Sequence, residues 1–494
     1  MKISLRNIHF RNTSNKIGWL LSFFLPVTAY VTLPFYGTAP EVVIFLSVML
    51  SAIVMWIFRL VPEYLPGLFV VISCAILKVV PANVILSGFF SEAFLMIFSI
   101  FAMTILIARS NLIPRYLFKL LRLFTKNPNY FDAVFFTSFA LLTPLIPSIV
   151  SRTHLVGEKS IAILDMFGVR EHEGCVIGTL VSSFFGATLF STIFLSASLM
   201  NFVVLALLSP QEQLQFYFVG WLNGALGALI GMLLAYAIFY AVLQRIFFKD
   251  RKLVIAKNNQ LVKINSQKLA EEQKKIVEEK IADLGPISKD EWFSMAALAV
   301  FFTGMIILPY YKISPAWIAI AISFVLLAFG ILTRKDIQFK INWKFLLYMA
   351  SIIGISGAIH YLNISGSILE KLQVFTKIFE GSPGHLFTFF VVVTLVVRLL
   401  LPIGATIALL VPVFITLSIL CGVTAWTACF TCLMISDIWF FKYQCIFYTP
   451  MTDVLAEAGV SFNERKFLTF NAMANIIRIL AIIASFYYWH WIGL

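Results

Sequence analysis

A polar segment interrupts a long apolar block in the first half of the chain. It holds Ser148, Ser151, Arg152 and Thr153. Hydroxyl groups donate and accept hydrogen bonds, and a guanidinium group matches a carboxylate with two parallel N–H donors. A charge at bilayer depth costs at least about 2.5 kcal/mol, so a functional role is the default interpretation of Arg152. The segment predicts a binding site for a small anion. The alternative is that Arg152 lies at the membrane rim, where it reaches the surface or pairs with Glu158.

A second apolar block, in the other half of the chain, has a corresponding tip at 401–406, which offers little beyond Thr406 and backbone groups. Its candidate binding residues are Gly404, Ala405 and Thr406. Helix ends that face each other at such a tip leave backbone N–H groups and positive dipole ends free for an anion. Arg398 stands about one helical turn before the tip, and Arg398, Glu158 and Asp437 are the candidate charge-compensating residues. The alternatives for Arg398 are that it reaches the outer surface or pairs with Asp437. Asp437 and Lys442 could instead form a buried pair without a transport role.

Each of these blocks is followed by an apolar segment with a polar middle. The first carries Ser196, Ser198 and Asn201, and the second carries Tyr443 and Gln444. A hydroxyl inside a helix is often bonded to the preceding turn, so each residue alone indicates little. Because they occur at equivalent places in both halves, we expect one substrate site built from all four polar segments.

The elements that position these residues are membrane-spanning helices. Hydrophobic residues make up 60% of 494 positions, only 12% are charged, and the mean hydropathy is +0.93. The apolar blocks are about 20 residues long, which spans a hydrocarbon core as a helix. The sequence therefore predicts an all-α polytopic membrane protein with about eleven transmembrane helices and two re-entrant hairpins. The net charge of +13 lies mostly in loops beside the spans, where it meets anionic lipids, so we exclude a nucleic-acid partner.

The apolar blocks divide the chain into five parts. Spans are expected at 17–36, 41–58, 66–81, 88–108, 174–208, 215–244, 293–310, 315–332, 343–362, 424–449 and 467–490. Hairpins are expected at 130–167 and 385–421, and amphipathic stretches at 112–124 and 366–380. The parts are N-terminal scaffold helices (1–87), a first repeat with a cytoplasm-opening hairpin (88–244), a cytoplasmic polar loop (245–292), further scaffold helices (293–342) and a second repeat with an outside-opening hairpin (343–494).

The distribution of Lys and Arg predicts the orientation. Basic residues crowd the 245–292 loop and the stretch that follows the span at 88–108. Three loops on the opposite side contain none: 36–41, 81–85 and 209–213. By the positive-inside rule, we expect the N-terminus and the central loop to be cytoplasmic, in the cell inner membrane. With both hairpins re-entrant, the C-terminus is periplasmic.

The two halves repeat the same order of elements. Each has a span, an amphipathic surface helix, a Pro-interrupted hairpin and a span with a polar middle, and the hairpins open to opposite sides. An inverted-topology repeat of this kind is typical of secondary transporters. The chain carries no P-loop, no zinc-protease motif and no nucleophile elbow, so we expect no enzyme activity. Cys429 and Cys432 lack further ligands nearby, so we expect no metal site.

Several segments resemble the divalent anion/sodium symporter family of the ion-transporter superfamily. The first tip, 147–152, is similar to that family's Pro-Ser-Asn-Thr-Ala-Arg pattern. Further similar segments follow in the family's order at 284–291, 341–343, 405–412, 443–444 and 488–493. The resemblance implies an elevator-type carrier, symporter or exchanger, of small di- or tricarboxylates or similar anions. Its mobile unit would consist of the two hairpins and the polar spans, and we expect a homodimer.

The tips depart from the family pattern in a way that bears on coupling. Sodium-coupled members carry Ser-Asn-Thr at both tips, and these residues bind Na⁺ and substrate carboxylates. Here the first tip reads Ser-Ile-Val (148–150) and the second Pro-Ile-Gly (402–404). Aliphatic side chains cannot ligate a hard cation, which requires oxygen ligands. We therefore expect altered or absent Na⁺ coupling, with Arg152 in place of a bound cation, and no other cofactor.

Two further function classes remain open at this point. The degenerate tips are compatible with a transport-dead homologue that acts as a receptor or assembly factor. A cation/proton antiporter of the same superfamily would need a titratable carboxylate at a tip, for which Glu158 and Asp437 are the candidates. Counterflow in proteoliposomes separates a carrier from a transport-dead homologue, and the hydropathy excludes a soluble binding protein.

Overall fold

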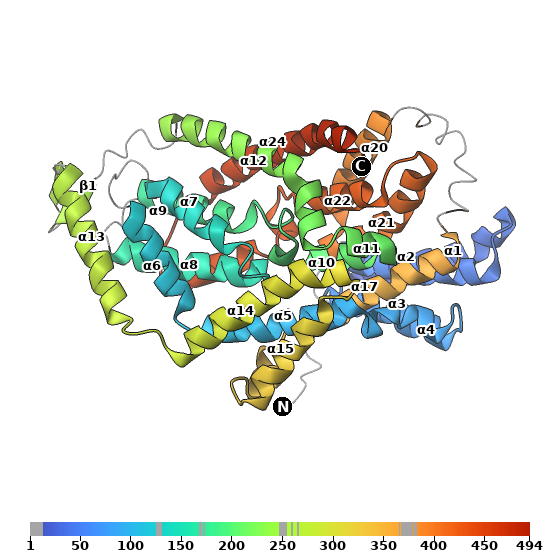
Figure 1. The fold of residues 1–494 in the computed structure, drawn as a ribbon. Coiled ribbons are helices and arrows are strands. Elements are labelled where there is room, and N and C mark those ends of the chain that lie inside the picture. The colour runs from blue at the N-terminus through green and yellow to red at the C-terminus, as the bar shows by residue number, and fades with distance from the viewer. Residues whose placement is uncertain are drawn as a thin grey trace. The chain divides into compact units, whose positions relative to one another are not determined.

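A computed structural model describes residues 13–124, 131–166, 170, 173–246, 254–257, 260–263, 266–364, 366, 379 and 383–494. Helices make up most of it (Figure 1). Within this part of the chain, eight helices are long and apolar enough to cross a membrane, and five shorter apolar helices accompany them. The predicted all-α polytopic membrane fold is confirmed, while the number of spans stays a prediction.

The N-terminal helices begin and end close to the predicted spans. They are α1 (Thr13–Thr32), α2 (Pro40–Ile57), α3 (Tyr64–Ile76) and α4 (Ala82–Ile85), with 3₁₀ turns η2 (Leu33–Tyr36) and η3 (Ser87–Phe90). A proline at the first position of α2 sets φ for the helix and needs no hydrogen bond there. α3, α4 and η3 all pack on α17 (Trp343–Tyr361). Gly67 allows the approach of α3, because a Cβ at Gly67 would lie 3.0 Å from the Cβ of Ser351.

The predicted amphipathic stretch is a helix with the same bounds. α5 (Glu92–Arg109) leads into α6 (Leu112–Phe124). A buried ion pair fixes α6 to the start of α14 (Lys289–Ile307), since Arg115 Nε lies 2.6 Å from Glu291 Oε1. Arg109 adds an exposed pair with Asp290 at 2.9 Å. The second predicted amphipathic stretch, 366–380, falls almost wholly outside the described residues.

The first interrupted block forms two helices joined by a short tip. α7 (Phe131–Leu142) and α8 (Ile149–Met166) both pack on α9 (Glu173–Thr188). The predicted single span at 174–208 is wrong: α9 stops at Thr188, a run of turns (189–193) and one 3₁₀ turn (η5, Leu195–Ala197) follow, and α10 (Leu199–Ala206) then begins. Hydropathy cannot show such a break, because the segment between the two helices is as apolar as they are. The next helices are α11 (Pro210–Gln215) and α12 (Phe218–Ile246).

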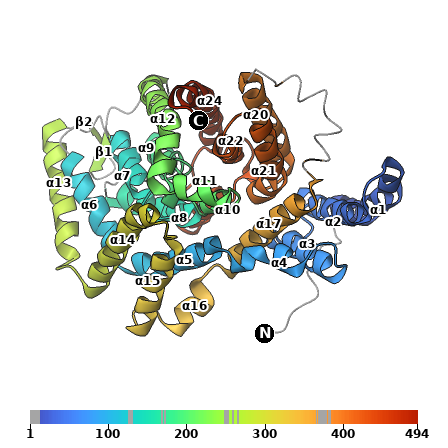
Figure 2. The same ribbon diagram turned by 45° about the vertical axis from the view of Figure 1, so that its right-hand side comes forward.

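The second interrupted block repeats this order. α20 (Pro383–Leu400) and α21 (Ile403–Leu420) both pack on α22 (Ala425–Ser436), as Figure 2 shows. The predicted single span at 424–449 is also wrong, since α22 stops at Ser436 and α23 (Tyr448–Glu457) begins only after an extended segment with the turn η7 (Lys442–Gln444). The last helix, α24 (Glu464–Ile492), lies along α12. Gly231 permits that packing, because a Cβ there would lie 3.0 Å from the Cβ of Ala481.

The segment predicted as a polar loop, 245–292, contains regular structure. It holds an antiparallel hairpin, β1 (Val254–Lys257) with β2 (Gln260–Lys263), and helix α13 (Ser266–Asp283). α13 is rich in Glu, Lys, Gln and Ala, which are strong helix formers, so a polar run is here a solvated helix. α15 (Ala316–Ala328) and α16 (Arg334–Lys340) follow α14. A hydrogen-bonded ion pair with Lys340, and bonds from Thr333, hold the pKa of Asp336 well below its usual range.

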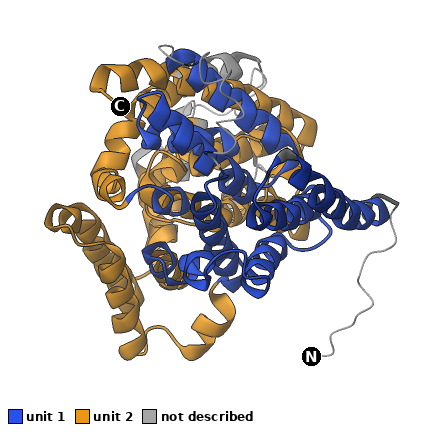
Figure 3. Cartoon of the chain, turned by 90° about the vertical axis from the view of Figure 1, so that its right-hand side faces the viewer, with its two compact units in different colours: residues 1–95, 203–209, 342–436 blue, residues 96–202, 210–341, 437–494 orange. Residues whose placement is uncertain are grey.

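The chain forms two compact units, coloured separately in Figure 3. Unit 1 comprises residues 1–95, 203–209 and 342–436. Unit 2 comprises residues 96–202, 210–341 and 437–494. Each unit therefore contains one of the two tips.

Candidate functional site

The first tip, in unit 2, is closed by serine side chains. Ser148 precedes α8 and caps it: its Oγ accepts a hydrogen bond from the backbone N–H of Ser151 at 3.2 Å. The hydroxyl of Ser151 donates to the same oxygen at 3.0 Å. A serine at this position satisfies an otherwise free N–H of the first turn. The Thr153 hydroxyl, by contrast, is buried and bonds back to the carbonyl of Val150 at 3.1 Å.

Arg152 is buried in a cage of backbone oxygens, with only 1% of its surface exposed. Its Nε donates to the carbonyl of Ala187 at 2.8 Å. Its Nη1 donates to the carbonyl of Ile146, to that of Ala197 at 2.6 Å and to that of Thr143 at 3.2 Å. Its Nη2 donates to the hydroxyl of Ser191 at 3.0 Å. The guanidinium thus joins the tip to both sides of the break between α9 and α10. These bonds favour a positioning role for Arg152, and direct contact with a substrate stays a prediction.

Other side chains satisfy the remaining carbonyls of the first break. Asn201 is fully buried, and its Nδ2 donates to the carbonyls of Ser191 at 2.8 Å and Phe194 at 2.9 Å. The Trp221 indole donates to the carbonyl of Thr192 at 2.9 Å. Because a free buried carbonyl costs about 1–3 kcal/mol, these donors are what allows backbone to leave the helix inside an apolar environment.

Two predicted residues connect this break to the tip and to α10. The hydroxyl of Ser196 donates to the carbonyl of Pro144 in the tip at 2.9 Å. Ser198 caps α10, since its Oγ accepts from the backbone N–H of Met200 at 3.3 Å. The structure therefore brings together the residues predicted at the first tip and the first break. They are Ser148, Ser151, Arg152, Ser196, Ser198 and Asn201.

The second break is held from α24, which also belongs to unit 2. Asn471 and Asn475 are fully buried and both donate through Nδ2 to the carbonyl of Trp439, the former at 2.6 Å. Gln444 Oε1 accepts from the backbone N–H groups of Phe440 at 2.8 Å and Phe441 at 3.0 Å. The predicted residue Gln444 thus shapes the segment, whereas its neighbour Tyr443 is half exposed and stacks on Phe441.

The second tip, in unit 1, also carries a buried arginine. Arg398 is 3% exposed; its Nε donates to the carbonyl of Ser436, the last residue of α22, at 2.7 Å. Its Nη1 donates to the carbonyl of Leu401, in the tip, at 2.9 Å. Arg152 makes the equivalent pair of bonds, to the end of α9 and to its own tip, but it comes from the second arm of its hairpin and Arg398 from the first.

The predicted residues that follow the second tip are packed rather than open. Gly404 lies against the ring of Tyr348, a buried residue of α17. Ala405 is 1% exposed, and the buried hydroxyl of Thr406 donates to the carbonyl of Pro402 at 3.1 Å.

The candidate charge-compensating carboxylates have different surroundings. Glu158 is 43% exposed and lies 3.6 Å from His154 and 3.7 Å from Lys159, so it belongs to the exposed face of α8. Asp437 is largely buried and lies 3.9 Å from Arg478 Nη1. Sequence reasoning missed Arg478, Asn471 and Asn475. Their spacing at i, i+4 and i+7 places three polar side chains on one face of an otherwise apolar span, and that pattern was the available signal.

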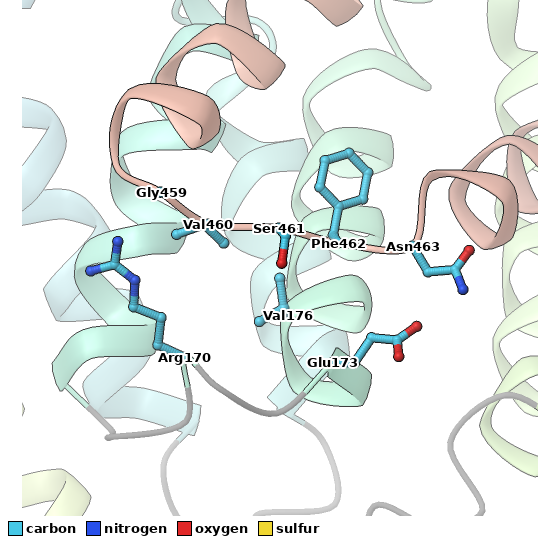
Figure 4. Close-up of a pocket in the computed structure, with 8 residues that line it drawn as sticks. All are labelled: Arg170, Glu173, Val176, Gly459, Val460, Ser461, Phe462 and Asn463. Carbon is cyan, nitrogen blue, oxygen red and sulfur yellow. The ribbon is translucent and has the colours of Figure 1, made fainter.

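A separate cavity of about 640 Å³ lies in unit 2, where Arg170 and the first turns of α9 meet the loop between α23 and α24 (Figure 4). Arg170, Glu173, Ser461 and Asn463 contribute its polar lining. Its charges are already engaged, since Glu173 pairs with Lys466 at 3.1 Å and Arg170 with Asp165 at 3.2 Å. None of the predicted site residues lines it. In the described part of the chain, no cluster of three His, Cys, Asp or Glu side chains could hold a metal ion.

Two pairs of helices joined at short tips, each packed on a helix that breaks in an apolar interior, are typical of a secondary transporter of the membrane. The sequence model of the sodium:sulfate symporter transmembrane region matches residues 18–494, and the chain belongs to this family. It is therefore an integral membrane carrier of a small anion and not an enzyme, and the family resemblance seen in the sequence is confirmed. A search of curated proteins finds no match.

Proposed function

We propose that this protein is an elevator-type exchanger of small di- or tricarboxylates, or similar anions, that works without sodium. The observation that carries the proposal is the placement of Arg152 within the carbonyl cage of the first tip. Sodium-coupled relatives are expected to use tip oxygens as cation ligands. Here a fixed cation occupies such oxygens instead.

A guanidinium and a sodium ion exclude each other at this tip. Both seek the same carbonyl oxygens, and those of Thr143, Ala187 and Ala197 already accept from Arg152. Two unit charges about 4 Å apart also repel each other by about 4 kcal/mol at an effective dielectric constant of about 20. The aliphatic residues that replace the family's Asn and Thr, Ile149 and Val150, remove two further ligands. The second tip supports the same conclusion, because Arg398 occupies its carbonyls and Ile403 follows Pro402.

A fixed cation also favours exchange over net uptake. A sodium ion leaves with its substrate, whereas Arg152 stays buried when the anion has gone. Moving an uncompensated charge through an apolar environment is costly, so the carrier returns more readily with a second anion bound. The anion itself is proposed to bind the serine hydroxyls at the start of α8 and α10, next to Ser151 and Ser198, where the helix dipoles are positive.

The first prediction is that counterflow does not depend on sodium. Purified protein in liposomes preloaded with unlabelled sulfate, succinate or citrate is expected to take up the labelled anion at the same rate in Na⁺, Li⁺, K⁺ and choline media. The physical reason is that an arginine side chain, Arg152 or Arg398, already bonds to the carbonyl oxygens that a Na⁺ ion would need at each tip. A saturable increase with Na⁺ alone would contradict the proposal. Absence of counterflow for every anion would favour the transport-dead alternative.

The second prediction concerns the membrane topology. The protein is proposed to lie in the inner membrane with its C-terminus on the periplasmic side. A reporter inserted between Lys257 and Gln260, where β1 ends and β2 begins, is expected to be cytoplasmic, and one fused after Leu494 periplasmic. Basic residues on the central segment and two re-entrant hairpins give this result. The measurement is paired alkaline phosphatase and fluorescent-protein fusions. Finding both reporters on one side would remove the inverted-repeat arrangement, and cross-linking of tagged copies tests the proposed homodimer.

A further inference from the structure

Three buried charges surround the two breaks of unit 2, and they do not balance. Arg152 and Arg478 are 1% and 2% exposed, and Asp437 is 9% exposed. The other buried charges described in this unit are paired elsewhere: Arg115 with Glu291, and Asp336 with Lys340. Two guanidinium groups therefore share the neighbourhood of one carboxylate, which leaves an excess of one positive charge.

Asp437 is placed to act on both arginines. Its Oδ2 lies 3.9 Å from Arg478 Nη1, which is at the outer limit of an ion pair. The same segment also reaches the helix that holds Arg152: the ring of Trp439 packs edge-on against Phe184 of α9, with ring centroids 6.2 Å apart, and α9 supplies the Ala187 carbonyl that accepts from Arg152. The position of Asp437 is fixed from α24: two residues further on, the carbonyl of Trp439 accepts from both Asn471 and Asn475. The same helix carries Arg478, so α24 sets the distance between the carboxylate and its partner.

Arg478 itself is incompletely satisfied by protein groups. Its Nε, like the Oδ1 atoms of Asn471 and Asn475, is buried without a hydrogen-bond partner. A buried charged donor that lacks a partner is costly, and replacing such a group by an apolar one is often neutral or stabilising. A buried arginine in the otherwise apolar helix α24 is therefore better explained by its charge than by packing.

We propose that the pair Asp437 and Arg478 sets the net charge of the anion site and so selects the charge of the substrate. This inference rests on the proposed function, because it assumes that the anion binds at the breaks of unit 2. With the pair intact, the site offers one uncompensated positive charge. Loss of Asp437 raises the excess to two charges and favours dianions over monoanions. Loss of Arg478 lowers it to zero and weakens the preference for dianions.

The test compares a dianion with its uncharged-end analogue. Wild-type protein, Asp437→Asn, Arg478→Gln and the double variant are reconstituted, and competition by succinate and by its monoamide against the labelled anion is measured. Asp437→Asn is expected to raise the succinate-to-monoamide preference by about tenfold or more, and Arg478→Gln to lower it by a similar factor. The double variant restores the net charge and is expected to lie within about threefold of wild type.

A purely structural role would not change the succinate-to-monoamide preference in opposite directions in the two single variants, and it would not restore the preference in the double variant. Asp290→Asn, which neutralises an exposed carboxylate paired with Arg109, is the matched control and is expected to leave the preference unchanged. If one single variant fails to fold, the other and the charge-balanced double variant still decide the sign. Wild-type transport with an unchanged preference in the variants overturns the inference alone. Absence of any wild-type exchange overturns the proposed function and, with it, this inference.

Discussion

Arg152→Ala is expected to abolish anion exchange, and free guanidinium ion is expected to restore part of it. The substitution removes a buried cation together with its bonds to the carbonyls of Thr143, Ala187 and Ala197. A hydrogen bond to a charged group contributes about 1.5–3 kcal/mol, so the loss of these bonds loosens the tip. Loss of the positive charge beside the proposed anion site is expected to lower anion affinity by at least about tenfold. The cavity that remains is lined by carbonyl oxygens with the spacing of a guanidinium, which a small planar cation can reoccupy.

The measurement is counterflow by reconstituted Arg152→Ala with millimolar guanidinium chloride, far below denaturing concentrations. Urea at equal concentration is the control, because it has nearly the same shape and no charge. Arg152→Lys keeps the charge but not the planar fork, so it is expected to retain an intermediate activity. Wild-type activity in Arg152→Ala would show that the cage does not need a cation. Rescue by Na⁺ rather than by guanidinium would show that the tip still selects a spherical ion.

Much of the fold follows from hydropathy and charge, because those quantities decide which segments can lie in a bilayer. The amphipathic helix α6 is predicted with its observed bounds, and both tips fall where prolines interrupt apolar blocks. The two broken helices were not predicted. A chain leaves a helix inside an apolar environment only where side chains satisfy its carbonyls, and the donors to the first break, Arg152, Asn201 and Trp221, come from three different helices. No local pattern contains that information.

The candidate site shows the same division between residue type and environment. Sequence reasoning selected Arg152, Arg398 and Asp437 because charges are rare in apolar segments. It could not predict that both arginines would bond to backbone carbonyls. Every residue has a backbone carbonyl, so the residue types do not indicate which carbonyls accept a hydrogen bond. Arg478 was not predicted as a site residue, for a different reason. It lies inside the last span, away from both tips, and only the tertiary fold brings it to Asp437.

Gly404→Ala is expected to displace the second tip and to lower exchange by at least about tenfold. Gly404 lies in the first turn of α21, and a Cβ built there would lie 2.6 Å from Cζ of the Tyr348 ring. Real Cβ atoms do not approach so closely, and Tyr348 is 5% exposed on α17, so its ring cannot swing aside. Overpacking of a well-filled core costs about 1–3 kcal/mol. The expected result is a lower melting temperature in detergent together with the loss of counterflow.

The partner residue makes the cause of that loss testable. Tyr348→Leu shortens the side chain that the new methyl group meets, so Gly404→Ala with Tyr348→Leu is expected to recover exchange relative to Gly404→Ala alone. Tyr348→Phe removes only the hydroxyl and leaves the ring carbons in place, so it is expected not to rescue. Gly174→Ala is the matched glycine control, since a Cβ at Gly174 meets nothing within 4 Å. Unchanged exchange in Gly404→Ala would mean that the tip has room to shift, and that close packing of α21 on α17 does not fix its position.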